Sequence, residues 1–248
     1  MLEAIDLCKS FGSLTVTNGV SFRLEKGERR AVLGPNGAGK TTLFNLLAGQ
    51  LAPSSGEIRL DGKNVTSCSV EARARMGLAR SYQKNNLFNG LTVGENLSLA
   101  AASALGYGGW LLRDSLGSKR VREVAEDVAA QVGLAGLLDA PVAQCPYGTR
   151  RQLEVGIALA SRPKVLLMDE PASGAGPGMI EALHRLLKSL PRDLTILIIE
   201  HDMDLAFDIA DRITVLNYGK AVFEGTPEET RKSPLVGEIY LGDWDSHA

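Results

Sequence analysis

The segment from Gly34 to Thr41 constrains the fold of this chain more than any other. It fits the pattern G-x-x-x-x-G-K-[ST] in full, with a β-prone run at 31–33 before it and a helical pattern over 40–48 after it. In such a segment the glycines let backbone N–H groups turn inward around a phosphate, and the following helix points its positive end at the same anion. A glycine-rich turn without a ligand is the alternative. The flanking strand and helix favour a phosphate-binding loop in an α/β fold.

This loop predicts that the cofactors of the chain are a nucleotide and Mg²⁺. Lys40 is expected to reach the β- and γ-phosphates, and the Thr41 hydroxyl is expected to bind Mg²⁺. The predicted nucleotide contacts in the loop are Gly34, Pro35, Asn36, Gly37, Ala38, Gly39, Lys40, Thr41 and Thr42.

Two acidic residues follow a continuous apolar run at 165–168, which is typical of a strand buried on both faces. Asp169 is predicted to hold Mg²⁺, and Glu170 is predicted to polarise the attacking water as general base. Two acids at the end of a strand are more often part of a solvated turn. The phosphate loop earlier in the chain reverses that expectation and favours nucleotide chemistry, in which Lys40 and Glu170 are catalytic.

His201 follows a second apolar run, at 195–199, and Glu200. A lone histidine is more often a structural hydrogen-bonding residue. The two apolar runs are, however, expected to lie side by side in a parallel sheet, and the carboxyl ends of parallel strands form the binding edge of such folds. His201 is therefore predicted to lie near the γ-phosphate.

Other patterns predict how the chain is organised around this loop. Residues 2–7 and 20–25 alternate like strands, and 57–60 runs into the turn-forming pair Asp61-Gly62, so we expect an antiparallel β subdomain early in the chain. Near the C-terminus, Tyr218-Gly219 is expected to join two strands of a hairpin. Thr226, Pro227 and Glu229 have the spacing of a helix cap.

Residues 84–160 differ from the rest because they carry helical periods and few β-branched runs. One apolar stripe at helical spacing consists of Val121, Val124, Ala125, Val128 and Val132. We therefore predict an α/β fold with a P-loop NTPase core, whose sheet is mainly parallel, and a helical insert. Residues 1–83 and 161–248 are expected to form the core with its antiparallel β subdomain, and 84–160 the helical subdomain.

Composition and charge narrow the function classes. With 27 Lys plus Arg against 29 Asp plus Glu, the formal net charge is −2, so no nucleic-acid partner is expected. The three cysteines stand far apart and the N-terminus lacks a basic leader, which favours a reducing cytoplasm over secretion. Residues 96–112 are uncharged, but they are short for a membrane span and rich in glycine near their end. A buried helix that runs into a Gly-rich loop is the prediction there.

The order of these motifs resembles that of ABC transporter ATPase subunits. The phosphate loop is followed by Gln83, a signature-like segment at 145–149, Asp169-Glu170 and His201. The resemblance covers essentially the whole chain. Further segments are similar to the importers of branched-chain amino acids and of related amides or urea, namely 40–46, 86–88, 91–93, 200–203 and 240–242.

The resemblance implies that the nucleotide is ATP, and it implies roles for individual residues. Phe11 is expected to stack on the adenine, with a packed Phe at the end of a strand as the alternative. Gln83 is expected to contact Mg²⁺ and the attacking water and to relay the nucleotide state to the membrane subunit. His201 is expected to contact the γ-phosphate.

The resemblance also implies partners. In the family two such chains face each other, and the signature of each closes over the phosphate loop of the other, which adds Pro146, Tyr147 and Gly148 to the expected nucleotide contacts. Residues 84–160 are expected to dock on a transmembrane permease subunit. A second ATPase subunit and, indirectly, a solute-binding protein complete the assembly, at the cytoplasmic face of the inner membrane.

Two positions depart from the family's pattern. Pro146 stands where a serine hydroxyl would donate to the γ-phosphate, and proline has no N–H to offer instead. The loss of one hydrogen bond to a charged group costs about 1.5–3 kcal/mol, or roughly one to two powers of ten in the closed dimer's equilibrium. Gly176 stands where an Asp or Asn is usual. We therefore expect an intact phosphate loop and base but a weak signature, unless Gly148 and the helix dipole carry enough of the contact.

Two other functions fit parts of the sequence. A soluble ABC-type ATP switch or assembly factor would tolerate a weak signature, and co-purification with permease-rich membranes would argue against it. A P-loop kinase for a small molecule would transfer phosphate to a metabolite in place of water. Gln83 and His201 are unnecessary for such a kinase, so an ATPase that energises a transporter is the leading prediction.

Overall fold

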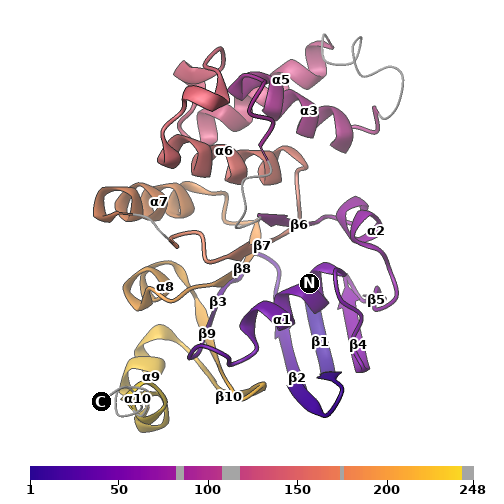
Figure 1. The fold of residues 1–248 in the computed structure, drawn as a ribbon, viewed down its shortest axis with the longest axis vertical. Coiled ribbons are helices and arrows are strands. Elements are labelled where there is room, and N and C mark those ends of the chain that lie inside the picture. Colours follow the sequence, from indigo (N-terminus) through magenta and orange to yellow (C-terminus); the bar gives the residue numbers. More distant parts are fainter. Residues whose placement is uncertain (82–86, 108–117, 174–175, 242–248) are drawn as a thin grey trace.

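The computed structural model describes residues 1–81, 87–107, 118–173 and 176–241. Its strands form two sheets that enclose helix α1, and further helices cover the outer face of the larger sheet (Figure 1). A layer of helices from the middle of the chain stands above the sheets in this view (Figure 1). The mixed α/β architecture with a P-loop core confirms the predicted fold class.

The smaller sheet is antiparallel and has the strand order β2-β1-β4-β5. Its strands are β1 (Leu2–Phe11), β2 (Leu14–Leu24), β4 (Ser55–Leu60) and β5 (Lys63–Asn64). Asp61 and Gly62 join β4 to β5 with φ angles of 50° and 74°. Two successive positive φ angles are what a tight hairpin turn requires, and this is why Asp-Gly predicted the turn correctly.

The larger sheet has the order β10-β9-β3-β8-β7-β6, in which neighbours from β9 to β6 run parallel and only β10 is antiparallel. Its strands are β3 (Arg29–Leu33), β6 (Leu78–Ser81), β7 (Val165–Asp169), β8 (Thr195–Ile199), β9 (Arg212–Asn217) and β10 (Lys220–Gly225). The predicted neighbouring of the 165–168 and 195–199 runs is confirmed by the parallel pairing of β7 and β8. Strand β6 was not predicted.

The central strands are buried on both faces, so alternate residues feed two different cores. Val32, Leu167 and Leu197 face α1 (Lys40–Ala48) and the antiparallel sheet. Leu33 and Leu166 face the other way, toward the helices that cover the outer face. These are α6 (Tyr147–Ala160), α7 (Pro177–Ser189) and α8 (Met203–Ile209). Burial on both faces explains the apolar runs at 165–168 in β7 and 196–199 in β8.

The layer of helices contains α3 (Val93–Ala104) and α5 (Lys119–Gln131), which pack on each other and on α6. The predicted stripe on α5 is confirmed, since Val121, Val124, Ala125 and Val128 are buried and Val132 is buried at its C-terminal cap. Residues 96–104 continue α3, with Leu97, Ala101 and Ala102 in the core. The Gly-rich part of the uncharged stretch, at 108–112, lies outside the described residues.

Short elements complete the chain: α2 (Val70–Arg75), two 3₁₀ turns (Ala135–Leu137 and Val142–Gln144), α9 (Pro227–Lys232) and α10 (Pro234–Leu241). The predicted cap of α9 is confirmed, because Thr226 and Glu229 form a reciprocal capping box with Pro227 in the first turn. Helix α2 was not predicted. Within the part of the chain that the structure describes, none of the helices combines the length and the apolar character needed to cross a membrane.

Candidate nucleotide-binding site

The phosphate loop connects β3 to α1 with a backbone that side chains would obstruct. Gly39 has a φ of 97°, and a Cβ atom there would lie 2.6 Å from the carbonyl oxygen of Val16. Gly34 is similarly confined, since its Cβ would lie 2.2 Å from the carbonyl oxygen of Leu216. Helix α1 begins without a side-chain cap, which leaves its first-turn N–H groups available to an anion. The geometry fits a phosphate group.

Lys40 lies in the first turn of α1 and is folded back over its own loop. Its Nζ donates hydrogen bonds to the carbonyl oxygens of Gly34 at 2.6 Å and Pro35 at 3.0 Å. Burial lowers the pKa of the Lys40 ammonium, and the charges of Glu170 and Asp169 oppose this effect. In the rest of the predicted loop, Asn36, Gly37 and Thr41 are exposed, Ala38 is buried, and Pro35 and Thr42 are partly exposed.

Asp169 ends β7 and is almost fully buried. Its Oδ2 accepts a hydrogen bond of 2.6 Å from Arg80 Nη2 of the neighbouring strand β6. Burial raises the pKa of the Asp169 carboxyl, and the Arg80 guanidinium opposes this rise. The other carboxylate oxygen, Oδ1, is buried and has no hydrogen-bond partner among the described residues.

Glu170 and His201 meet directly at the carboxyl ends of β7 and β8. His201 Nε2 lies 2.5 Å from Glu170 Oε1, so the imidazole donates a hydrogen bond to the carboxylate. The Glu170 backbone has a φ of 46°, which is rare for a residue other than glycine. The predicted base and the predicted γ-phosphate contact therefore lie side by side, as the parallel pairing of their strands required.

Glu200 is a buried carboxyl next to His201 in the chain, and it was not predicted as a site residue. Its Oε1 accepts from the backbone N–H of Ala172 at 3.0 Å, and its Oε2 accepts from that of His201 at 3.2 Å. Burial raises the pKa of Glu200 from its ordinary 4.5 to about 7, and the backbone N–H groups oppose the rise. The signal in the sequence was a carboxyl placed immediately after a wholly apolar strand.

Phe11 and Gln83 were also predicted to be site residues. Phe11 is half exposed at the end of β1, with Lys9 Nζ 5.2 Å from its ring centre. The β1–β2 hairpin reaches the phosphate loop through Val16. Gln83 lies outside the described residues.

The signature-like segment is at the start of α6, with Pro146 as N-cap and Tyr147 and Gly148 in the first turn. Pro146 and Tyr147 are exposed, and no side chain caps the helix. Helices α6 and α1 lie on opposite sides of β6 and β7 (Figure 1). The signature is therefore not brought to the phosphate loop of its own chain.

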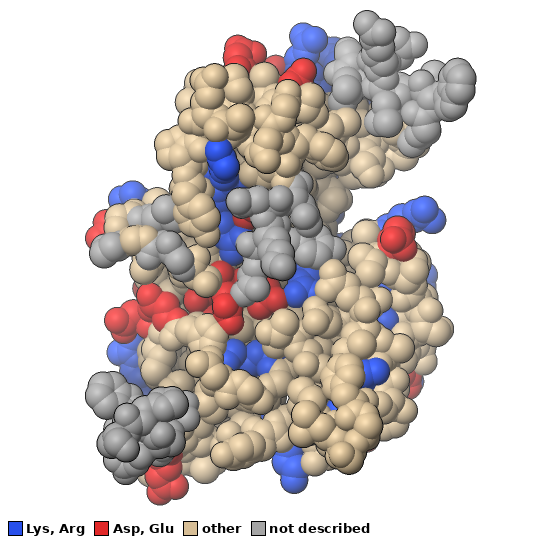
Figure 2. All heavy atoms as spheres, viewed as in Figure 1, with Lys and Arg blue, Asp and Glu red and all other residues tan. Residues whose placement is uncertain are grey.

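Two pockets are considered as possible ligand sites on the described part of the surface. One of about 330 Å³ lies beside the predicted base and is lined by Glu170, Glu200, His201 and Asp202, among others. On the face drawn in Figure 2, acidic side chains gather where the layer of helices meets the sheets, with Lys and Arg side chains beside them.

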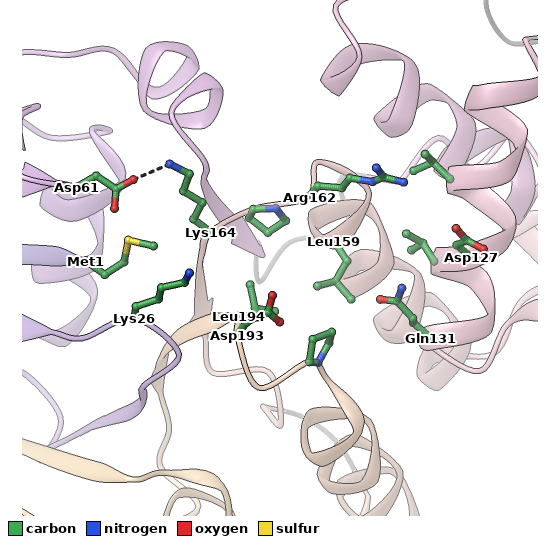
Figure 3. A pocket seen from close by; sticks show the side chains of 14 residues that line it. Met1, Lys26, Asp61, Asp127, Gln131, Leu159, Arg162, Lys164, Asp193 and Leu194 are labelled. Carbon is green, nitrogen blue, oxygen red and sulfur yellow. Dashed lines mark hydrogen bonds and ion pairs between the residues drawn. The ribbon is translucent and has the colours of Figure 1, made fainter.

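The other hollow, of about 560 Å³, lies near the amino ends of β7 and β8 and against α5 (Figure 3). An ion pair of 2.6 Å between Lys164 and Asp61 lies along it. Its other charged residues are Lys26, Asp127, Arg162 and Asp193, so the two signs balance. Ligands of parallel α/β sheets bind at the carboxyl ends of the strands, so the larger hollow is not the nucleotide site.

The arrangement defines a class of protein. A glycine-rich loop before a helix, with two acids and a histidine at the carboxyl ends of adjacent parallel strands, is the site of a P-loop nucleoside triphosphatase. The family described as ABC transporter matches residues 17–173, which is more than half of the chain. The chain therefore belongs to the ABC transporter family, as one of its ATP-binding, ATP-hydrolysing subunits.

Relatives of known name agree with this assignment. The high-affinity branched-chain amino acid transport ATP-binding protein BraF of Pseudomonas aeruginosa is 36% identical over 250 residues, with 98% of each chain covered. The protein of the same description named LivG, from Escherichia coli strain K12, is 37% identical over 252 residues, also with 98% of each covered. The predicted resemblance to this group is confirmed.

Solved structures share the fold over nearly their whole length. The ATP-binding cassette MJ1267 of an ABC transporter superposes with a TM-score of 0.85 at 28% identity, covering 97% of this chain and 98% of that one. Its ADP conformation gives a TM-score of 0.83 at 29% identity, covering 98% of each. ATP-binding subunits of this family bind ATP and ADP, dimerise and work with transmembrane permeases.

Proposed function

We propose that this chain binds ATP at its phosphate loop and hydrolyses it to drive an ABC importer of branched-chain amino acids or related amides or urea. The observation that carries the proposal is the meeting of three groups at one edge of the parallel sheet. These are the phosphate loop after β3, the two acids at the end of β7 and the histidine after β8. The solute class is supported by BraF and LivG, which are branched-chain amino acid transport proteins.

The residues present fit a magnesium ion bound together with the nucleotide. Asp169 Oδ1 is buried without a hydrogen-bond partner in the described part of the chain, and Thr41 lies exposed in the first turn of α1. Mg²⁺ is usually held by one or two protein oxygens together with substrate phosphates. Thr41 and Asp169 are the proposed ligands, with Gln83 as the third. When bound, the ion neutralises charge on the phosphates.

Each remaining group has a proposed part in hydrolysis. Lys40 exchanges the carbonyl oxygens of its own loop for the β- and γ-phosphates. Glu170 accepts the proton of the attacking water, and its hydrogen bond to His201 holds the carboxylate at the end of β7. His201 then contacts the γ-phosphate, so its imidazole moves between the base and the nucleotide.

In this proposal, another residue of this chain and a second ATPase subunit complete the nucleotide site. Phe11 stacks on the adenine, and Pro146, Tyr147 and Gly148 of one chain face the phosphate loop of a second ATPase subunit. Residues 84–160 form the helical subdomain that docks on a transmembrane permease, with 1–83 and 161–248 as the core. A solute-binding protein takes part indirectly. The assembly lies at the cytoplasmic face of the inner membrane.

The signature of this chain is the weaker half of the proposed dimer. Pro146 offers neither a hydroxyl nor an N–H at the N-cap of α6, so only the N–H groups of the first turn face outward. We therefore propose that the isolated chain hydrolyses ATP slowly and that a second ATPase subunit with a complete signature restores the rate. High turnover by this chain alone would refute that part of the proposal.

The experiment that tests the function is the substitution Glu170→Gln, followed by measurement of ATP turnover and of particle mass in solution with ATP. The variant removes the base and leaves Lys40, Thr41 and Asp169 in place. We expect turnover to disappear while ATP still binds, and a closed dimer to accumulate if the signature functions. A variant that binds ATP but remains a monomer would point to a heterodimer. Turnover equal to that of the wild type would overturn the assignment of the base.

A further inference from the structure

The turn that carries the proposed base is held in an unusual backbone conformation. Glu170 has a φ of 46°, and residues in this region persist only where their surroundings fix them. The Glu170 N–H donates to the Ile199 carbonyl at 2.9 Å, and the Ser173 N–H donates back to the Glu170 carbonyl at 3.0 Å. The turn runs from Glu170 to Ser173, and it is also held by side chains of α6 and by Glu200.

One side of the turn is held by Arg151, a buried residue of α6. Its Nε donates to the Pro171 carbonyl oxygen at 3.0 Å, and its Nη2 donates to the Glu170 carbonyl oxygen at 3.2 Å. Its Nη1 also forms an ion pair of 2.6 Å with Glu154 Oε2, one turn further along the same helix. The planar guanidinium of Arg151 thus joins the backbone of Glu170 and Pro171 to α6, the helix that begins at the signature-like segment.

Tyr147 and Glu200 also contact the turn at residues 170–173. Tyr147, in the first turn of α6, donates through Oη to the Ser173 carbonyl oxygen at 3.2 Å. From the opposite side, Glu200 accepts from the Ala172 N–H at 3.0 Å. The turn from Glu170 to Ser173 is therefore enclosed between α6 and the segment that carries His201. A shift of α6 along its axis cannot leave the carbonyls of this turn where they are.

We propose that Arg151 is a positioning residue for hydrolysis, which sets the backbone of Glu170 and couples the base to the N-terminus of α6 in the same chain. The inference rests on the proposed role of Glu170. Pro146 to Gly148 and Arg151 lie within about one and a half turns at the start of the same helix, α6. When a partner's nucleotide draws the first turn of α6 toward it, Arg151 carries that displacement to Glu170.

A purely structural buried ion pair is the competing explanation for Arg151 and Glu154. The two explanations differ in what they change. Loss of a structural pair lowers the melting temperature and leaves the turnover of the folded molecules as it was. Loss of a positioning contact lowers kcat, while KM and the dissociation constant for ATP stay close to the wild-type values.

The test compares Arg151→Lys and Arg151→Met with the wild-type full-length chain. Lysine keeps the positive charge beside Glu154, so that variant is expected to fold, but its compact ammonium lacks the planar fork with which Arg151 contacts Glu154 and two carbonyl oxygens at the same time. We expect kcat to fall about 10-fold in Arg151→Lys and further in Arg151→Met, as for loss of hydrogen bonds to a charged donor. The exposed Arg122 on α5 supplies the charge-matched control, Arg122→Met, which should leave kcat and melting unchanged.

The outcomes separate this inference from the proposed function. If Arg151→Lys is folded and keeps the wild-type kcat, Arg151 does not position the base, even if Arg151→Met fails to fold. If kcat falls with KM unchanged in Arg151→Lys, the inference is supported. The variant Glu170→Gln is measured in parallel. If it retains full turnover, the proposed function itself fails, whatever the Arg151 variants do.

Discussion

Replacing Glu200 with glutamine is expected to remove a large pH dependence from the stability of this protein. The carboxyl is 2% exposed and has a pKa raised by burial from 4.5 to about 7. Below pH 4.5 it is protonated in both the folded and the unfolded chain. Between the two values the unfolded chain has released its proton and the folded chain has not, so the free energy of unfolding falls as the pH rises.

The size of the effect follows from the two pKa values. A difference of one pKa unit is worth about 1.36 kcal/mol, so the shift from 4.5 to about 7 removes about 3 kcal/mol of stability once the pH exceeds the folded-state value. Most of this loss falls between pH 5 and pH 8. Glutamine is neutral throughout and keeps a carbonyl that can accept from the Ala172 N–H. The variant should therefore gain about 2–3 kcal/mol relative to the wild type over that range.

The assay is chemical denaturation of both proteins at several pH values, followed by two spectroscopic probes whose transitions must coincide. The quantity of interest is the difference between the two proteins, because every other titrating group contributes equally to both. Glu126→Gln, on the exposed face of α5, is the control and should give the same difference from wild type at every pH. A Glu200→Gln difference that stays constant from acid to alkaline pH would refute the argument that burial keeps this carboxyl protonated.

Further expectations concern the loop and the caps. Lys40→Met should weaken ATP binding about 10- to 100-fold by calorimetry, since a charged donor to the phosphates is lost. Gly39→Ala should abolish ATP binding in the same titration, because its Cβ would lie 2.6 Å from the Val16 carbonyl at a φ of 97°. Thr226→Ala should destabilise the chain by about 1 kcal/mol through loss of the α9 capping box, lowering the melting temperature by about 2–4 °C. Pro146→Ser should raise melting by a similar amount by capping α6, and unchanged melting would contradict this.

Much of the fold was predictable because its signals are local. Residues 165–168 and 196–199 lie in strands that are buried on both faces and are therefore apolar without interruption, and Asp61-Gly62 tolerates the positive φ angles of a hairpin turn. Strand β6 escaped prediction because it has only four residues and includes Arg80, whose place at the sheet depends on its ion pair with Asp169. Helix α2 is also short, and its buried side chain is Arg73, which donates to the backbone carbonyls of Leu46 and Leu47.

The residues of the site also divide into those that the sequence predicted and those that it did not. Lys40, Asp169, Glu170 and His201 lie where strands end, and sheet topology alone brings those ends together. Arg151 and Glu200 were missed because they act on backbone groups 20 and 28 residues away in sequence, at Pro171 and Ala172. Backbone N–H and C=O groups are the same in nearly every residue, so no sequence motif marks which of them a distant side chain will contact. Only the i, i+3 spacing of Arg151 and Glu154 hinted at a buried pair on α6.

Helix α6 faces two sites at once in the proposed dimer, and this separates the consequences of its substitutions. Its first turn, after Pro146, presents backbone N–H groups outward to the nucleotide of the partner subunit. One turn later, Arg151 holds the base that acts on the nucleotide of its own subunit. In this proposal, a proline at the N-cap weakens the partner's site directly and acts on the chain's own base only through Arg151. In a heterodimer, Pro146→Ser should then raise turnover at the partner's phosphate loop, whereas Arg151→Lys should lower it at the phosphate loop of this chain.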